Sequence, residues 1–170
     1  VSSVEIGIPE GSRLGPAAPR PRALRKPIVF YGTSITHGAC ASRPGMVHTA
    51  ILGRRFDRPV INLGSSGNGR METEVVELMA EIDAAAYVID CLPNVRSDLV
   101  QQRARPVVDI LRAERPKTPI LLVEDRSYSN AFLISDQQRR NESSRAALRA
   151  AFQQMQQDGI PNVHYLPGDR

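Results

Sequence analysis

Short apolar runs alternate with amphipathic stretches from residue 28 onward, and this alternation leaves few folds open to the chain. Five runs have the length of buried strands: 28–31, 60–63, 86–91, 119–123 and 162–166. Apolar residues at helical spacing predict the helices between them: 46–56, 71–82, 106–115 and 137–158. Strands that alternate with helices form βαβ units, which build a parallel sheet with helices on both faces. We therefore expect an α/β fold, a three-layer α/β/α domain with a five-stranded parallel sheet of the flavodoxin-like type.

The expected helices also carry signals for their ends and for their inner faces. Pro106 suits the first turn of a helix, and Gly159 is placed as the stop of the last one. The residues expected on the apolar faces are Met46, Val47, Ala50 and Ile51 in the first helix, Met71, Val75, Leu78, Met79 and Ile82 in the second, and Leu148, Ala151, Phe152 and Met155 in the last.

The first 27 residues differ in texture from the rest. Residues 1–8 alternate partly, as a strand does, and prolines then interrupt the segment: Pro9, Pro16, Pro19, Pro21 and Pro27. So many prolines deny both a helix and a central strand, which indicates an extended linker. We interpret 1–27 as the end of a preceding β domain plus a linker, and 28–170 as the α/β domain.

Composition argues against two classes of partner. The 170 residues carry a net charge of +4, but arginine supplies all but two of the 22 basic residues, and these alternate with Asp and Glu. A nucleic-acid surface clusters its basic residues beside exposed aromatics, whereas only 5% of this chain is aromatic. No apolar run approaches the roughly 18 residues of a membrane span. We expect neither nucleic acid nor a membrane as a partner, and a cytoplasmic location.

The cysteines and histidines do not indicate a cofactor. Two cysteines, Cys40 and Cys91, are too few for a disulfide framework or a four-cysteine zinc site. A single bridge between them stays open, and free thiols are the expectation. No His, Cys and Asp spacing is typical of a metal site, so we expect neither metal nor cofactor.

Polar residues follow the first three expected strands, at the edge where parallel sheets place their sites. Segment 32–38 contains Ser34, a glycine-rich turn at 64–69 contains Gly67, and Asn94 follows the third strand. A hydroxyl beside backbone N–H groups and an amide can combine a nucleophile with donors for an oxyanion. The fourth strand is followed by 124–126 (EDR), either part of a substrate rim or a surface ion-pair cluster.

Phosphate-binding loops are the main alternative. The first segment lacks the lysine and the spacing of a Walker loop, and Thr36 stands where the α/β-hydrolase elbow G-x-S-x-G has its second glycine. The second segment reverses the dinucleotide motif, yet it lies between a strand and a helix, where a phosphate can dock. A nucleotide-binding or non-catalytic α/β module therefore stays open as a second class of function.

Three segments in order resemble the sequence blocks of the SGNH, or GDSL-like, hydrolases: 32–38 (GTSITHG), 62–68 (NLGSSGN) and 90–94 (DCLPN). The resemblance covers roughly 28–166 and implies an ester hydrolase or an acyltransferase. It implies Ser34 as the nucleophile, with Gly67 and Asn94 as oxyanion donors. The start of the chain resembles the branch of the family in which a β-sandwich precedes the SGNH domain.

The family takes its general base from a D-x-x-H segment after the fifth strand, and residues 1–170 contain none. A serine hydroxyl is a poor nucleophile without an imidazole, so we expect the base beyond residue 170 and little activity without it. The three histidines have other expected places: His37 in the pocket, His48 on the first helix and His164 within the last strand. The third block also departs from the family at Leu92 and Val95, where Gly and Asp are usual.

Each site residue also has a structural interpretation. Ser34 suits a plain turn, Gly67 a positive φ angle, and Asn94 a cap of the next segment. Asp90 is expected as a buried hydrogen-bond acceptor and Cys91 as core. The expected partner is a small-molecule acyl ester or acyl donor. An esterase and a natural-product tailoring O-acyltransferase both fit, and the arginine-rich composition hints at the second.

Overall fold

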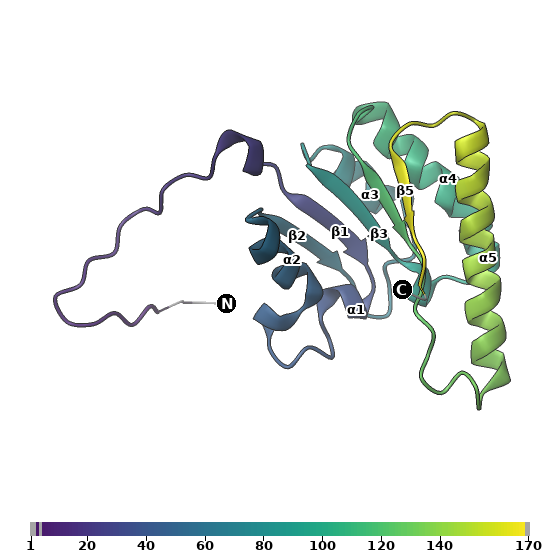
Figure 1. The fold of residues 1–170 in the computed structure, drawn as a ribbon, viewed down its shortest axis with the longest axis horizontal. Helices are drawn as coiled ribbons and strands as arrows, with labels where there is room; N and C mark the ends of the chain where they lie inside the picture. The colour runs from purple at the N-terminus through teal and green to yellow at the C-terminus, as the bar shows by residue number, and fades with distance from the viewer. Residues whose placement is uncertain (1–2, 4, 169–170) are drawn as a thin grey trace.

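The computed structural model describes residue 3 and residues 5–168. Its sheet consists of β1 (Ile28–Gly32), β2 (Val60–Gly64), β3 (Ala86–Asp90), β4 (Ile120–Val123) and β5 (Val163–Leu166). The strands are parallel and lie in the order β2-β1-β3-β4-β5 (Figure 1). The predicted α/β fold with a five-stranded parallel sheet is confirmed.

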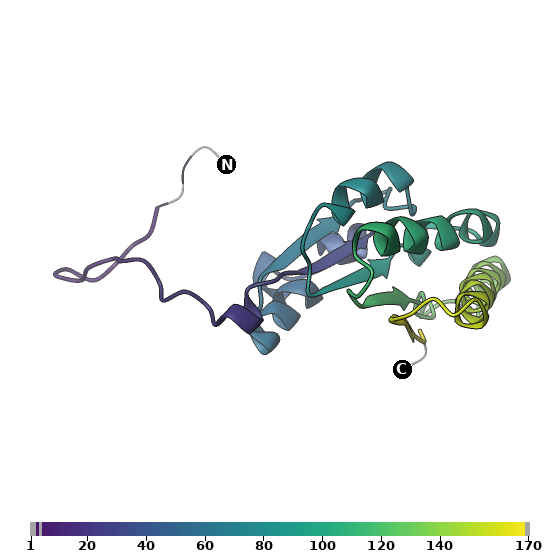
Figure 2. The ribbon, with the colours of Figure 1, turned by 90° about the horizontal axis from the view of Figure 1, so that it is seen from above.

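The helices lie on both sides of this sheet. They are α1 (Ser34–His37), α2 (His48–Phe56), α3 (Thr73–Ala80), α4 (Ser97–Glu114) and α5 (Ser135–Gln157), with 3-10 turns η1 (Arg22–Leu24), η2 (Pro44–Met46) and η3 (Leu92–Asn94). Figure 2 shows α3 and α4 on one face and α2 on the other. Helix α5 packs along α4 and β5 (Figure 1).

Side chains along each strand point alternately to the two faces of the sheet, and one of these faces holds the core. In the three inner strands every second residue points to α3, α4 and α5, and these side chains are at most 2% exposed: Val29, Tyr31, Tyr87, Ile89, Ile120 and Leu122. They pack against Val76, Val108, Leu111 and Leu148 of the helices. The other face carries α2, and beside it an apolar groove of about 450 Å³ lined by Phe30, Val88, Leu121 and Val123.

Helix α4 is longer than predicted. It begins at Ser97 instead of near Pro106, so the proline lies in the helix interior rather than in its first turn. Pro106 has no N–H to donate to the carbonyl of Gln102, which normally costs a helix stability. The added turns bury Val100 and Ala104, and this tertiary packing offsets the loss.

Three residues predicted to face the sheet are exposed instead. Met46 is 43%, Ile51 40% and Leu78 65% exposed. The physical reason is the helical phase. Residues 44–46 form the turn η2 before α2 starts, and Met71 has a left-handed φ of 59° and lies outside α3, which starts at Thr73. The stop at Gly159 is confirmed, with α5 ending at Gln157 and a φ of 72° at the glycine.

Residues 5–21 run away from the sheet as an exposed, extended segment (Figure 1). The strand predicted over 1–8 is wrong for residues 3 and 5–8, which are not in a strand, because no neighbouring strand pairs with them; residues 1, 2 and 4 lie outside the described residues. Among the helices of the described chain, none has the length and hydropathy needed to cross a membrane.

Candidate active site

Three strands end side by side at one edge of the sheet. Gly32 of β1 pairs with Gly64 of β2 and with Asp90 of β3, so the segments that follow begin abreast. The strand order also reverses at β1, since β2 lies on one side of it and β3 on the other. Ligands of open parallel sheets bind at such a switch point. This edge is therefore the candidate active site.

Ser34 opens the one-turn helix α1 directly after β1. The Thr33 side chain caps the helix by accepting a hydrogen bond from the N–H of Ile35, at 3.3 Å. Gly38 ends it in a left-handed conformation with φ of 101°, and its N–H donates to the carbonyls of Ser34 and Ile35. Ser34 is partly exposed at this edge.

The glycine-rich segment lies against the segment that carries Ser34. The N–H of Ser65 donates to the carbonyl of Gly32 at 3.0 Å. Gly67 has a φ of 71°, as its structural interpretation requires, and Arg70 Nη2 donates to its carbonyl at 3.1 Å. Gly69 approaches so closely that a Cβ there would lie 2.0 Å from the Gly32 oxygen. Two of the three predicted segments are thus in direct contact.

We expect Gly69→Ala to separate these segments. The left-handed φ of 69° costs about 1–2 kcal/mol for an L residue, and the added methyl also collides with the Gly32 backbone. The free energy of unfolding, measured in urea, should fall by more than that amount. Gly67→Ala is the matched control, because a Cβ there meets nothing within 4 Å and only the φ cost remains. Equal losses in the two variants would contradict the close approach.

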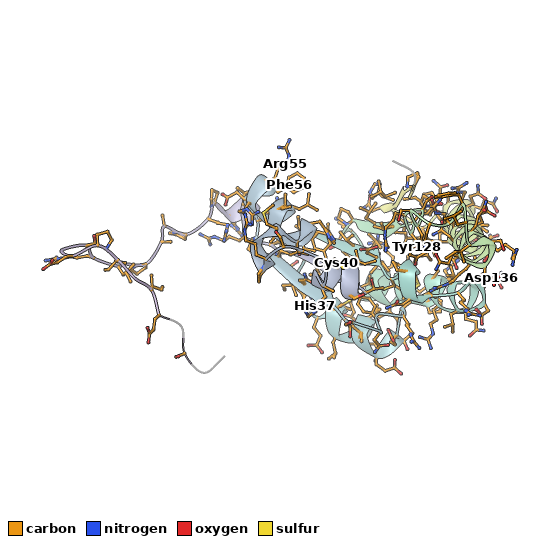
Figure 3. The ribbon with its side chains drawn as sticks, turned by 90° about the horizontal axis from the view of Figure 1, so that it is seen from below. His37, Cys40, Arg55, Phe56, Tyr128 and Asp136 are labelled. Atoms are coloured by element: carbon orange, nitrogen blue, oxygen red, sulfur yellow. The ribbon has the colours of Figure 1, made fainter. Side chains whose placement is uncertain are left out.

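Asn94 joins the third segment to the second. It ends the 3-10 turn η3, whose Leu92 and Pro93 are buried, and its Nδ2 donates to the carbonyl of Asn68 at 2.6 Å. A carboxamide carries two N–H donors, and this bond uses one of them. The bond brings Asn94 next to the Gly67 turn. Figure 3 views this edge, with His37 and Cys40 to one side of Tyr128 and Asp136.

Sequence reasoning missed the groups that hold the glycine-rich segment at its far end. Tyr31 is 2% exposed and donates to the Glu72 carboxylate, which also accepts the N–H of Arg70 at 2.6 Å. Burial raises the pKa of Glu72, but these hydrogen bonds outweigh burial and keep it below its ordinary value. Burial and the bond to Glu72 raise the pKa of the Tyr31 hydroxyl. No motif marks Tyr31, which reads as a strand residue.

Asp90 accepts a hydrogen bond, as predicted. Thr36 Oγ1 donates to its Oδ2 at 2.8 Å, and burial raises the pKa of this carboxyl above its ordinary value. Cys91 is fully buried, and burial raises the pKa of its thiol, so its predicted core role is confirmed. Both cysteines are free.

The histidines take separate places. His37 is exposed and its Nδ1 lies 3.0 Å from the Gly64 carbonyl, which puts it beside the predicted site. His48 packs edge-on against Phe30 and lines the apolar groove. His164 is exposed on β5, where a partly buried residue was predicted, because it points to the face of the strand opposite to Val163 and Tyr165, which pack against the core.

The two acidic residues of segment 124–126 are buried, whereas Arg126 is exposed. Glu124 is 3% and Asp125 4% exposed. The Glu124 carboxylate accepts from Arg149 and from the N–H of Gly168, at 2.7 and 2.9 Å, and also from Tyr165. Burial raises the pKa of Glu124, yet the hydrogen bonds keep it below its ordinary value. The segment thus ties β4 to the chain that leaves β5.

In the described part of the chain, no group of three or more His, Cys, Asp or Glu side chains could hold a metal ion.

Comparisons with known proteins identify relatives of the chain. The sequence profile of the GDSL-like lipase/acylhydrolase family matches residues 25–170. A solved structure assigned as a GDSL-like lipase from Bacteroides ovatus is 35% identical, with a TM-score of 0.82 over 85% of this chain and 43% of that one. No curated protein sequence matches.

Two further solved structures share the fold at lower identity. The salicylyl-acyltransferase SsfX3 from a tetracycline biosynthetic pathway is 22% identical, with a TM-score of 0.74 over 84% of this chain and 42% of that one. A family two carbohydrate esterase from Clostridium thermocellum, solved with cellohexaose, is 15% identical, with a TM-score of 0.65 over 90% and 56%. The chain spans less than half the length of the lipase and the acyltransferase.

Proposed function

Because the chain belongs to the GDSL-like lipase/acylhydrolase family, we propose that it hydrolyses or transfers an acyl ester through an acyl-serine intermediate. The observation that carries the proposal is the contact between the three segments at one edge of the sheet. Ser34 starts α1, the Ser65 N–H reaches Gly32, and the Asn94 side chain reaches Asn68. These contacts hold the segments that carry Ser34, Gly67 and Asn94 next to one another, which supports the proposal.

In the proposed reaction Ser34 Oγ attacks the ester carbonyl carbon while its proton passes to a general base. The carbonyl oxygen becomes an oxyanion, held by the backbone N–H groups of Ser34 and Gly67 and by Asn94 Nδ2. The C–O bond to the leaving alcohol breaks as the base returns the proton to that alcohol. Water or a second hydroxyl then attacks the acyl-serine and releases the acyl group.

The general base is proposed to lie beyond Arg170, in a D-x-x-H segment such as the family uses. Residues 1–170 contain no such segment. The His37 ring has its Nδ1 directed to the Gly64 carbonyl, which supports a place in the pocket wall rather than a role as the base.

The proposal includes two kinds of enzyme, which differ in whether water or another hydroxyl accepts the acyl group. A natural-product tailoring O-acyltransferase is the second candidate, and it is favoured by the likeness to the salicylyl-acyltransferase SsfX3. Hydrolases and acyltransferases differ in how far the acyl-enzyme excludes water. Product analysis with and without an added alcohol separates the two, since only a transferase forms mainly the new ester.

We expect residues 1–170 alone to turn over p-nitrophenyl acetate on the order of 100-fold more slowly than the chain extended past Arg170. The reason is that general-base catalysis contributes roughly 10²–10⁴-fold. Both forms are assayed at equal concentration, and circular dichroism checks that both are folded. Equal, robust turnover would show that the base lies within residues 1–170. Absence of Ser34 labelling by a fluorophosphonate in the extended chain would instead favour a non-catalytic or nucleotide-binding module.

A further inference from the structure

Thr36 is the buried member of α1, and two strands hold it. Its side chain and backbone are 0% exposed. Its Oγ1 donates to Asp90 Oδ2 at the end of β3, at 2.8 Å. Its carbonyl oxygen accepts from Nδ2 of Asn62 on β2, also at 2.8 Å. The turn that begins with Ser34 is thereby bonded to both neighbours of the strand that precedes it.

The Asn62 side chain connects three elements. Besides Thr36, its Nδ2 donates to Oγ1 of Thr49 on α2 at 3.0 Å, and Thr49 is 1% exposed. Its Oδ1 accepts the N–H of Gly64 at 2.9 Å, where the glycine-rich segment starts. One carboxamide therefore couples α1, α2 and the start of the segment that carries Gly67.

The glycines that end β1 and β2 pack closely against α1. A Cβ on Gly32 would lie 2.1 Å from Thr36 Oγ1 and 2.6 Å from the Asp90 carbonyl. A Cβ on Gly64 would lie 2.1 Å from the N of His37. Both strand ends therefore approach α1 closely, at the same places where the bonds to Asn62 and Asp90 are made.

We propose that Thr36, held by Asn62 and Asp90, is a positioning residue that orients the Ser34 hydroxyl toward the Gly67 and Asn94 donors. The inference rests on the proposed role of Ser34. A helix of four residues is too short to keep its geometry by its own hydrogen bonds, so tertiary bonds must fix it. Asn62 links the orientation of Ser34 to the start of the Gly67 segment, because it bonds to both.

Thr36→Val tests the inference, since valine keeps the shape of threonine and lacks the hydroxyl. In the extended chain we expect kcat to fall on the order of 10- to 100-fold with KM nearly unchanged, because a small misplacement of a reacting group costs this much. Thr36→Ser, which restores the hydroxyl, should recover kcat to within a few-fold. Thr118→Val, the same change before β4 at the opposite end of the sheet, should leave kcat unchanged. If Thr36→Val does not fold, Asn62→Ala on the edge strand β2 removes the bond to the Thr36 carbonyl, together with those to Thr49 and Gly64, and should lower kcat likewise.

Hydrogen exchange of residues 33–39 gives a second readout that does not need turnover. We expect faster exchange in Thr36→Val and Asn62→Ala than in the parent, with Thr36→Ser and Thr118→Val close to it. Parent-like exchange and kcat in Thr36→Val would overturn the inference. If the parent chain fails to react at Ser34 while exchange follows the expected order, the proposed function has failed and the anchoring by Thr36 stands.

Discussion

Ser34→Ala should reduce ester turnover by the extended chain on the order of 10⁴- to 10⁶-fold, to near the rate without enzyme. The variant removes the only atom that forms the acyl-enzyme bond in the proposed reaction. The loss should appear in kcat, because the oxyanion donors and the rest of the pocket stay in place. Hydrolysis of p-nitrophenyl acetate measures the rate, and mass spectrometry after fluorophosphonate treatment should find no adduct in the 32–39 peptide.

Ser42→Ala is the matched control for this experiment. Ser42 is exposed and lies in the same connection between β1 and α2, eight residues after Ser34. Its replacement by alanine removes an equivalent hydroxyl away from the strand ends. It should label and turn over like the parent chain. Undiminished activity in Ser34→Ala would exclude the acyl-serine mechanism, even though Ser34 lies at the same sheet edge as Gly67 and Asn94.

Asn94→Ala should lower kcat on the order of 10²- to 10³-fold, the usual cost of one lost oxyanion donor. The effect should fall on kcat rather than on KM, because the oxyanion exists only near the transition state. The variant also loses the bond from Nδ2 to the Asn68 carbonyl, so the Gly67 turn loses a support. Steady-state kinetics of the extended chain measure both parameters.

Asn68→Ala is the matched control for Asn94→Ala. It keeps the backbone carbonyl that Asn94 bonds to and removes an exposed side chain from the same turn, so kcat should change far less than in Asn94→Ala. Asn94→Asp provides a further comparison, since a carboxylate of the same shape cannot donate and repels an oxyanion. An Asn94→Asp variant with parent-like kcat would remove Asn94 from the proposed site.

The sheet could be predicted well because its signals are local. Apolar runs such as 28–31 and 86–91 are short, buried and separated by helical spacing, and hydrophobic periodicity reports that directly. Helix starts were less predictable. Pro106 is a first-turn signal in isolation, and only the burial of Val100 and Ala104 against the rest of the fold overrides it.

In the candidate site, too, some residues could be predicted from the sequence and others could not. Ser34, Gly67 and Asn94 could be nominated because each follows a strand, and parallel strands end at one edge. The groups that hold those residues were missed or assigned elsewhere, since their partners are distant in sequence. Thr36 bonds to Asp90 across 54 positions, and Tyr31 bonds to Glu72 across 41. The acidic residues after β4 were also misassigned, since Glu124 bonds to Gly168 across 44 positions. Nothing in the sequence near Glu124 indicates that β5 will bury it.

The crowded glycines that end β1 and β2, together with Gly69, limit which positions at this edge of the sheet can be substituted. Gly32, Gly64 and Gly69 each stand where even one methyl group would strike a backbone atom, whereas Gly67 faces open space. A directed-evolution library for new ester preferences should hold the three crowded positions constant and randomise Ser65 and Ser66, which are exposed between them. Natural variants of this chain are then expected to differ mostly at such outward positions.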